Sequence, residues 1–215
     1  LQPLFEQYGY WQKAITLMAR FQSLAKQFED WNAVVRYKMH EARYWSFAEE
    51  FKRAEAILDS AQTALQKIED LDTRKRREAK VLNVLAGVFQ KQGKKEEAIQ
   101  TFRDEILIEE EIGDDRSLAI VCNRLGKLLQ SQGKLEEAQQ FFEQGILINE
   151  AINDLFSLSI GLNCLGGLLQ EQGKLGEAQQ AFEREIGIAE AINDQSQLAI
   201  GLNCLRGLLQ QQGKS

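Results

Sequence analysis

Amide side chains recur along this sequence at intervals of 40 residues. Four asparagines share this spacing, and each is followed seven residues later by a glutamine. The positions are Asn83, Asn123, Asn163 and Asn203, with Gln90, Gln130, Gln170 and Gln210. A side-chain amide offers one acceptor and two donors, which match the C=O and N–H groups of a peptide backbone. A row of such amides therefore predicts a surface that holds an extended protein segment through its backbone.

A polar solvent face copied by duplication is the alternative interpretation of these amides. The residues between each asparagine and its glutamine include Gly87, Lys127, Gly167 and Gly207. Asparagine and glycine cost a helix about 0.5 and 1 kcal/mol relative to alanine, whereas a merely solvated face would favour glutamate or lysine. The segment 80–117 has diverged widely from the later copies, but it keeps Asn83, Gly87 and Gln90. We therefore favour a partner-binding face, to which Lys127 also belongs.

A repeat of 40 residues positions these amides. The triplet Gln-Gly-Lys occurs at 92–94, 132–134, 172–174 and 212–214. Alanine marks the same repeat at positions 14, 54, 98, 138 and 178, so four extra residues lie between Ala54 and Ala98. We place this insertion around 71–78. Because four residues are about one helical turn, we expect a longer helix there or a changed angle between the flanking repeats.

Each repeat is predicted to form two antiparallel helices. In the unit that begins at Leu118, the apolar residues fall within about 60° on either side of Leu125, which is typical of an amphipathic helix. Gly133 ends this helix, because glycine commonly follows a helix end. The second helix begins near Lys134, and Asp154 can cap the helix that follows it. The short loops require neighbouring helices to pack antiparallel.

The amides are expected on the side of the first helix that faces away from the core. Four residues of the unit lie between about 140° and 220° from Leu125 on the helical wheel. These are Ile120, Asn123, Lys127 and Gln130. This position, opposite the apolar stripe, would leave them free to meet a partner.

The repeat resembles the tetratricopeptide repeat in the runs LGKLLQSQGKLEEAQQFF and LGGLLQEQGKLGEAQQAF. Its period is similar to that of the longer, 40-residue Leu-Gly-Asn type. The resemblance is strong from Lys80 to Ser215 and weak over 8–70. We therefore predict divergent repeats over 1–72 and a regular array over 73–215, truncated after the first helix of the last repeat. The sequence departs from the family pattern at Glu105 and Glu185, where a small residue is usual.

This resemblance implies an all-α, helix-turn-helix repeat solenoid, a right-handed superhelix whose concave groove is lined by first helices. It also implies a protein–protein interaction module that binds a peptide or protein segment in the groove. Arg36 and Arg43, on an earlier first helix, would favour an acidic segment. Two alternative functions stay open. One is the sensor or regulatory arm of a larger multidomain signalling ATPase, whose phosphate-loop domain would precede Leu1, and the other is a self-association scaffold.

The last predicted helix, Leu198 to Gln212, lacks a second helix to cover it. Stacked arrays normally need a polar capping unit, and a bare apolar stripe marks an interaction site. The stripe consists of Leu202, Leu205, Leu208 and Leu209. We expect these residues to be exposed and to allow self-association.

Several other classes of function are not favoured. The net charge of −6 argues against nucleic-acid binding, and no apolar run approaches the roughly 20 residues that span a bilayer. No signal peptide is visible, so we expect a cytoplasmic protein. The ending GLLQQQGKS has one residue too many between its glycines for a phosphate loop. His40 is the only histidine, and the three cysteines form no CxxC pair. We therefore expect no enzyme activity, no cofactor and no metal, and we expect free thiols at Cys122, Cys164 and Cys204.

Overall fold

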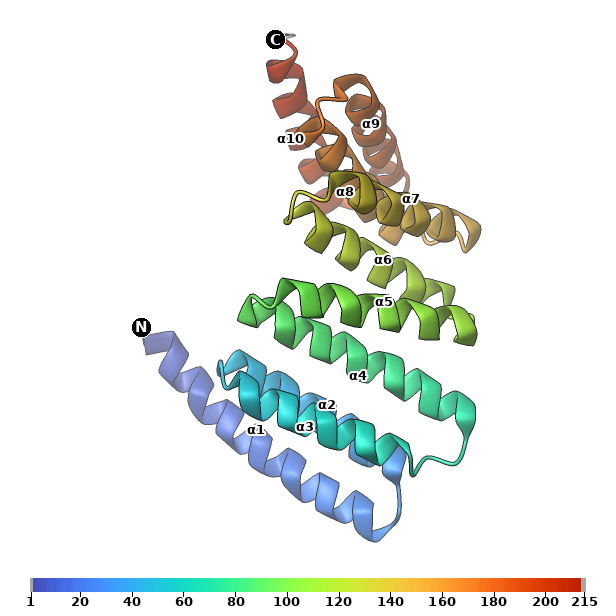
Figure 1. The fold of residues 1–215 in the computed structure, drawn as a ribbon. Helices are drawn as coiled ribbons and strands as arrows, with labels where there is room; N and C mark the ends of the chain where they lie inside the picture. The colour runs from blue at the N-terminus through green and yellow to red at the C-terminus, as the bar shows by residue number, and fades with distance from the viewer. Residues whose placement is uncertain (1, 214–215) are drawn as a thin grey trace. The chain divides into compact units, whose positions relative to one another are not determined.

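The computed structural model describes residues 2–213, with side chains for 12–213. Helices make up 85% of the chain, and no strand occurs among the described residues (Figure 1). The helices are α1 (Gln2–Gln27), α2 (Trp31–Phe47), α3 (Phe51–Leu65), α4 (Leu71–Gln92), α5 (Lys95–Ile112), α6 (Asp115–Gln130), α7 (Leu135–Ala151), α8 (Leu155–Glu171), α9 (Leu175–Ala191) and α10 (Gln195–Gln211). The predicted all-α fold is therefore confirmed.

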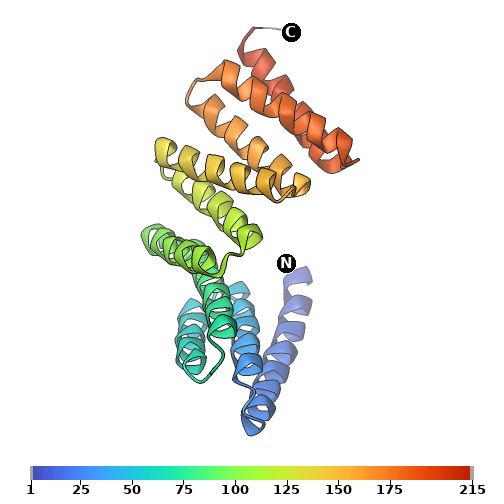
Figure 2. The ribbon, with the colours of Figure 1, turned by 90° about the vertical axis from the view of Figure 1, so that its right-hand side faces the viewer.

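The chain forms two compact units, Leu1–Ile112 and Gly113–Ser215. In the first unit, α2 pairs with α3 and α4 with α5, while α1 packs on α2. In the second unit, α6 pairs with α7 and α8 with α9, and α10 packs on both α9 and α8 (Figure 2). First helices also contact each other within a unit, α2 with α4 and α6 with α8. The boundary that the sequence predicted between residues 72 and 73 falls inside α4. The division into divergent and regular repeats stays a prediction.

Local sequence signals set the helix ends. Gly133 and Gly173 follow first helices with φ angles of 73° and 78°, in the left-handed region that glycine enters without strain. The carboxylate of Asp154 accepts a hydrogen bond from the backbone N–H of Ser157 at 3.1 Å, which caps α8. Asp194 caps α10 in the same way, from Ser196 and Gln197. The predicted turns and caps are confirmed.

The four inserted residues lengthen one helix. The first helix α4 has 22 residues, whereas α6 has 16 and α8 has 17. Asp70 caps α4 through the backbone N–H of Thr73, at 2.7 Å, so the added turn lies at the start of the helix. The longer helix predicted around 71–78 is confirmed.

The Leu-Gly pairs of the first helices α6 and α8 lie against an aromatic ring of the second helix of the same repeat. Leu125 is fully buried, as is Phe142 on α7. A Cβ on Gly126 would lie 2.7 Å from the Phe142 ring, and a Cβ on Gly166 would lie 2.6 Å from the Phe182 ring. Each glycine therefore provides the space that the ring of the same repeat occupies.

The last helix is less exposed than the sequence predicted. Leu208 is fully buried, and Leu205 and Leu209 are partly buried. Leu205 and Leu208 pack in the cluster that includes Ala178 and Phe182 of α9. The prediction considered the absence of a second helix after α10. It did not consider that the preceding repeat covers one side of α10. Leu202 stays exposed, at 50%. Self-association through α10 stays a prediction.

The two glutamates that depart from the family pattern are buried in the structure. Glu185 on α9 accepts a hydrogen bond from the Ser159 hydroxyl at 3.2 Å. Its other oxygen, Oε2, has no hydrogen-bond partner among the described residues. A Cβ on Gly201 of α10 would lie 1.7 Å from that oxygen. The glycine therefore provides the room for the carboxyl group.

We expect Glu185 to lower the stability of the second unit as pH rises from the ordinary pKa of a glutamate through the raised pKa of this side chain in the folded state. Burial raises the pKa of this carboxyl, opposed by the Ser159 hydrogen bond and assisted by the negative charge of Asp194. A group whose folded-state pKa is raised contributes stability below its unfolded pKa and loses it as pH rises through the folded value. Urea denaturation at several pH values should therefore show a smaller slope for Glu185→Gln. The exposed Glu183→Gln on the same helix is the control, and an unchanged slope in Glu185→Gln would contradict the assignment.

No helix in the part of the chain that the structure describes is long and apolar enough to cross a membrane.

Candidate functional site

A small pocket lies between the first helices α6 and α8 of the second unit. It has a volume of about 180 Å³. Its lining residues are Ile120, Asn123, Arg124 and Lys127 of α6, with Ser157 and Ile160 of α8. The 40-residue repeat explains why these side chains meet, because it puts equivalent residues of successive first helices side by side.

Asn123 is buried, which corrects the expectation that it faces away from the core. Its side chain is only 8% exposed, although it also lines the pocket. A Cβ on Gly145 of α7 would lie 3.1 Å from its Oδ1 atom, and a Cβ on Gly161 of α8 would lie 3.6 Å from it. The helical wheel treated α6 as packed on one side. In the array α6 is covered by α7 and also by α8, and both glycines leave room for the amide.

The orientation of the Asn123 amide decides what it can offer a ligand. Oδ1 is on the buried side and has no hydrogen-bond partner among the described residues. This leaves the Nδ2 group as the donor at the pocket. The amide occupies the space that the missing side chains of Gly145 and Gly161 leave between α7 and α8.

The other three asparagines of the predicted row have different partners. The Asn83 amide donates to Glu105 Oε1 at 2.8 Å, and the Asn163 amide donates to Cys204 Sγ at 3.7 Å. Asn203, which is exposed, accepts a hydrogen bond from the guanidinium of Arg206 at 3.1 Å. The row is therefore not uniform, and Asn123 is the member that lines the α6–α8 pocket.

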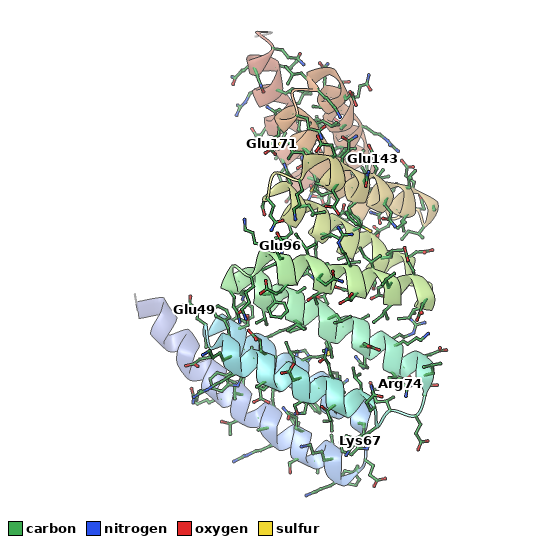
Figure 3. All side chains as sticks on the ribbon, in the orientation of Figure 1. Glu49, Lys67, Arg74, Glu96, Glu143 and Glu171 are labelled. Atoms are coloured by element: carbon green, nitrogen blue, oxygen red, sulfur yellow. The ribbon has the colours of Figure 1, made fainter. Side chains whose placement is uncertain are left out.

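Two of the predicted glutamines join successive first helices. The Gln130 amide donates to Glu171 Oε2 at 2.8 Å, at the end of α8 where Figure 3 labels Glu171. Gln170 donates to Gln211 Oε1 at the same distance. Gln210 is exposed, and Gln90 is partly buried in the first unit. These hydrogen bonds give Gln130 and Gln170 a role within the array, beside any role in binding.

The predicted basic residues are divided between the two units. Lys127 is exposed on α6 at the pocket and hydrogen-bonds to Cys164. Burial raises the pKa of the Cys164 thiol, and the Lys127 charge opposes that rise. Arg43 is exposed on α2, in the first unit, and does not line this pocket. Burial lowers the pKa of His40, assisted by the charges of Arg43 and Arg36.

The sequence prediction placed Ile120 on the binding face but missed that isoleucine recurs there in a row. Ile120, Ile160 and Ile200 each precede an asparagine by three residues. Ile120 and Ile200 are 45% and 44% exposed, and Ile120 and Ile160 line the pocket. The same 40-residue spacing was the available signal, because a large apolar residue repeated on a first helix outside the core stripe needs a reason.

The three cysteines form no disulfide with one another among the described residues. Cys122 is buried, Cys164 and Cys204 are partly buried, and all three are free thiols, as predicted. The described part of the chain holds no group of three His, Cys, Asp or Glu side chains that could bind a metal ion.

Comparison with known proteins relates this geometry to a family. Residues 77–151 match a family model described as the tetratricopeptide repeat. A comparison with curated protein sequences finds no match. Among solved structures, the chain is similar to BtubC (BKLC) from P. vanneervenii, with a TM-score of 0.83 and 17% sequence identity over 95% of this chain and 85% of that one.

Two further structures share the fold. One is a signal transduction ATPase with numerous domains and a tetratricopeptide repeat sensor, from Pyrococcus horikoshii, with a TM-score of 0.77 and 17% identity over 93% of this chain and 30% of that one. The other is a Rap protein complexed with competence and sporulation factor, with a TM-score of 0.61 and 15% identity over 93% and 59% of the two chains. At these identities the likeness concerns the fold.

Proposed function

Because residues 77–151 are tetratricopeptide repeats and the whole chain has a repeat fold of this kind, we propose that the second unit binds an extended segment of another protein at the α6–α8 pocket. The observation that carries this proposal is the Asn123 amide, which lies in the space beside Gly145 and Gly161 and lines the pocket with two isoleucines. Nδ2 would donate a hydrogen bond to a backbone carbonyl of the segment.

The size and lining of the pocket favour a side chain of a protein over a small molecule. Small-molecule sites usually enclose about 300–1,000 Å³, and this pocket holds about 180 Å³. Ile120 and Ile160 would contact one apolar side chain of the bound segment, while Lys127 would favour an acidic residue next to it. The Rap protein provides a parallel of the same fold, since its structure is described as a complex with competence and sporulation factor.

The glycines on the same face support a close approach of the bound chain. A Cβ on Gly167 of α8 or on Gly207 of α10 would meet no atom within 4 Å. No packing within the described residues therefore requires glycine at these positions, although glycine costs a helix about 1 kcal/mol. A segment that lies against the helix backbone would provide the reason.

Selection of a random peptide library on the full chain tests the proposal. Peptides recovered from phage display should bind about fivefold more weakly to Asn123→Ala, because one hydrogen bond contributes about 1 kcal/mol. Ile120→Ala should weaken binding further, since it removes the exposed apolar wall. Both variants should keep their melting temperature, because Ile120 is exposed and Asn123→Ala removes a buried acceptor without a partner.

Gln140→Ala is the matched control, because this amide is exposed on α7 outside the pocket. Peptides should bind it as they bind the original chain. The proposal fails if the library gives no binder, or if the recovered peptides bind Asn123→Ala, Ile120→Ala and the original chain equally. In this proposal the residues that line the pocket bind the partner segment and catalyse no reaction.

A second candidate function is the sensor arm of a larger signalling protein. The observation in its favour is that 93% of this chain matches only 30% of the length of the Pyrococcus horikoshii ATPase. The description of that ATPase includes a tetratricopeptide repeat sensor. A phosphate-loop domain encoded next to these residues in the full gene would support this function. A gene that encodes only the repeats would rule it out.

A further inference from the structure

A second, larger pocket lies in the first unit and is lined by helices α1, α2 and α3. Its volume is about 470 Å³, within the range of small-ligand sites. The residues that carry its chemistry are Lys26, Trp31, Lys38, Ser60 and Lys67. It shares no residue with the α6–α8 pocket, so its function does not depend on the one proposed above.

The first notable residue is Lys38, a buried lysine on α2. Its side chain is 9% exposed, and its Nζ donates to the Ser60 hydroxyl oxygen at 2.7 Å. The structure gives Lys38 no carboxylate partner among the described residues. Glu41, one turn further along α2, accepts hydrogen bonds from Gln22 at 2.5 Å and from Trp45 at 3.4 Å. A buried charge without an opposite charge is costly, so a position with only a structural role would favour methionine or leucine.

Two further lysines surround the same space. The Lys67 ammonium, labelled in Figure 3 just past the end of α3, lies 3.9 Å from the centre of the Trp31 ring. Lys26 is near enough for its charge to act on Lys38. Burial lowers the pKa of Lys38, and the Lys26 charge lowers it further, against a smaller opposite effect of Glu41. Three lysines therefore line one pocket, and none of the residues that line it is acidic.

We propose that this pocket binds a phosphate monoester. The dianion would neutralise the excess positive charge, which a single carboxylate would do only in part. Lysine is a common phosphate ligand that acts as a point charge. The Ser60 hydroxyl accepts from Lys38 and keeps its own hydrogen for a phosphate oxygen. The Trp31 ring and Val34 provide an apolar wall for the group that carries the phosphate.

Isothermal titration calorimetry of the full chain with phenyl phosphate, in a phosphate-free buffer, tests the assignment. We expect saturable binding to one site, and at least tenfold weaker binding of benzoate. Lys38→Met should reduce the affinity for phenyl phosphate at least tenfold. It should also raise the melting temperature of the ligand-free chain, because it removes an uncompensated buried charge.

Two further variants separate binding at this pocket from effects on folding or on net charge. Lys67→Met changes an exposed side chain and should weaken phenyl phosphate binding several-fold with little effect on folding. Lys80→Met, an exposed lysine on α4 outside the pocket, makes the same change in net charge and should leave the affinity unchanged.

The possible outcomes either support or overturn the assignment. A phosphotyrosine peptide that binds at least tenfold more tightly than phenyl phosphate would support it and would identify a phosphorylated protein as the source of the group. Benzoate binding as tightly as phenyl phosphate would overturn the choice of phosphate. The absence of saturable binding, or equal binding by Lys38→Met and Lys80→Met, would overturn the site.

Discussion

Replacement of Phe142 by alanine is expected to destabilise the second unit by about 3–5 kcal/mol, the usual cost of removing a buried aromatic side chain. Phe142 is fully buried on α7, and its ring fills the space above Gly126 of α6. A domain of ordinary stability has only about 5–15 kcal/mol in total, so much of the stability of the unit depends on this contact. Urea denaturation followed by circular dichroism measures the loss.

Leu147→Ala is the control for Phe142→Ala. Leu147 lies on the same helix and is 64% exposed, so its truncation should change the free energy of unfolding by no more than about 0.5 kcal/mol. Comparable losses in the two variants would contradict the assigned role of Phe142.

A double-mutant cycle tests the contact between Phe142 and Gly126 directly. Gly126→Ala alone should be destabilising, because its Cβ would lie 2.7 Å from the ring. In the Phe142→Ala background the same change should stabilise the unit by about 1 kcal/mol, because alanine is the better helix former. If the effects of the two substitutions on the free energy of unfolding are additive, Gly126 does not serve to make room for the Phe142 ring.

Replacement of Gly201 by alanine should destabilise the second unit by about 1–3 kcal/mol, the usual cost of overpacking a core. The new Cβ would lie 1.7 Å from Glu185 Oε2 and 2.9 Å from Ile186 Cγ1. Glu185 is fully buried, so its carboxyl group can move away from the new methyl group only if neighbouring side chains move too. Thermal denaturation should show the lower melting temperature.

Gly207→Ala, on the same helix α10, should have the opposite effect. Its Cβ would meet no atom within 4 Å, so the helix gains about 1 kcal/mol. The destabilising effect of Gly201→Ala should become smaller in a Glu185→Ala background, where the carboxyl group is absent and only the contact with Ile186 remains. If Gly201→Ala and Gly207→Ala change the stability in the same direction, the assigned packing of Glu185 against α10 is wrong.

The sequence alone determined the helices and their ends. Gly133, Asp154 and the apolar stripe around Leu125 act within one or two turns of chain, so their effect is readable without the fold. The four extra residues near 71–78 were readable for the same reason, because a shift in a regular period measures an insertion directly. The identity of the repeat followed from the same local pattern of leucine, glycine, alanine and aromatic residues.

Only the tertiary structure decided which side chains the neighbouring repeats cover. Asn123 was predicted to face away from the core, because a helical wheel assumes that a helix has one buried side. Stacking of the repeats gives α6 a second buried side, which contains Asn123. Leu208 was predicted to be exposed, and α9 covers it. Lys26 of α1, Lys38 of α2 and Lys67, just past the end of α3, meet in space although no fixed spacing in the sequence relates them. Burial of this kind depends on contacts between separate helices, and such contacts are set by packing in three dimensions.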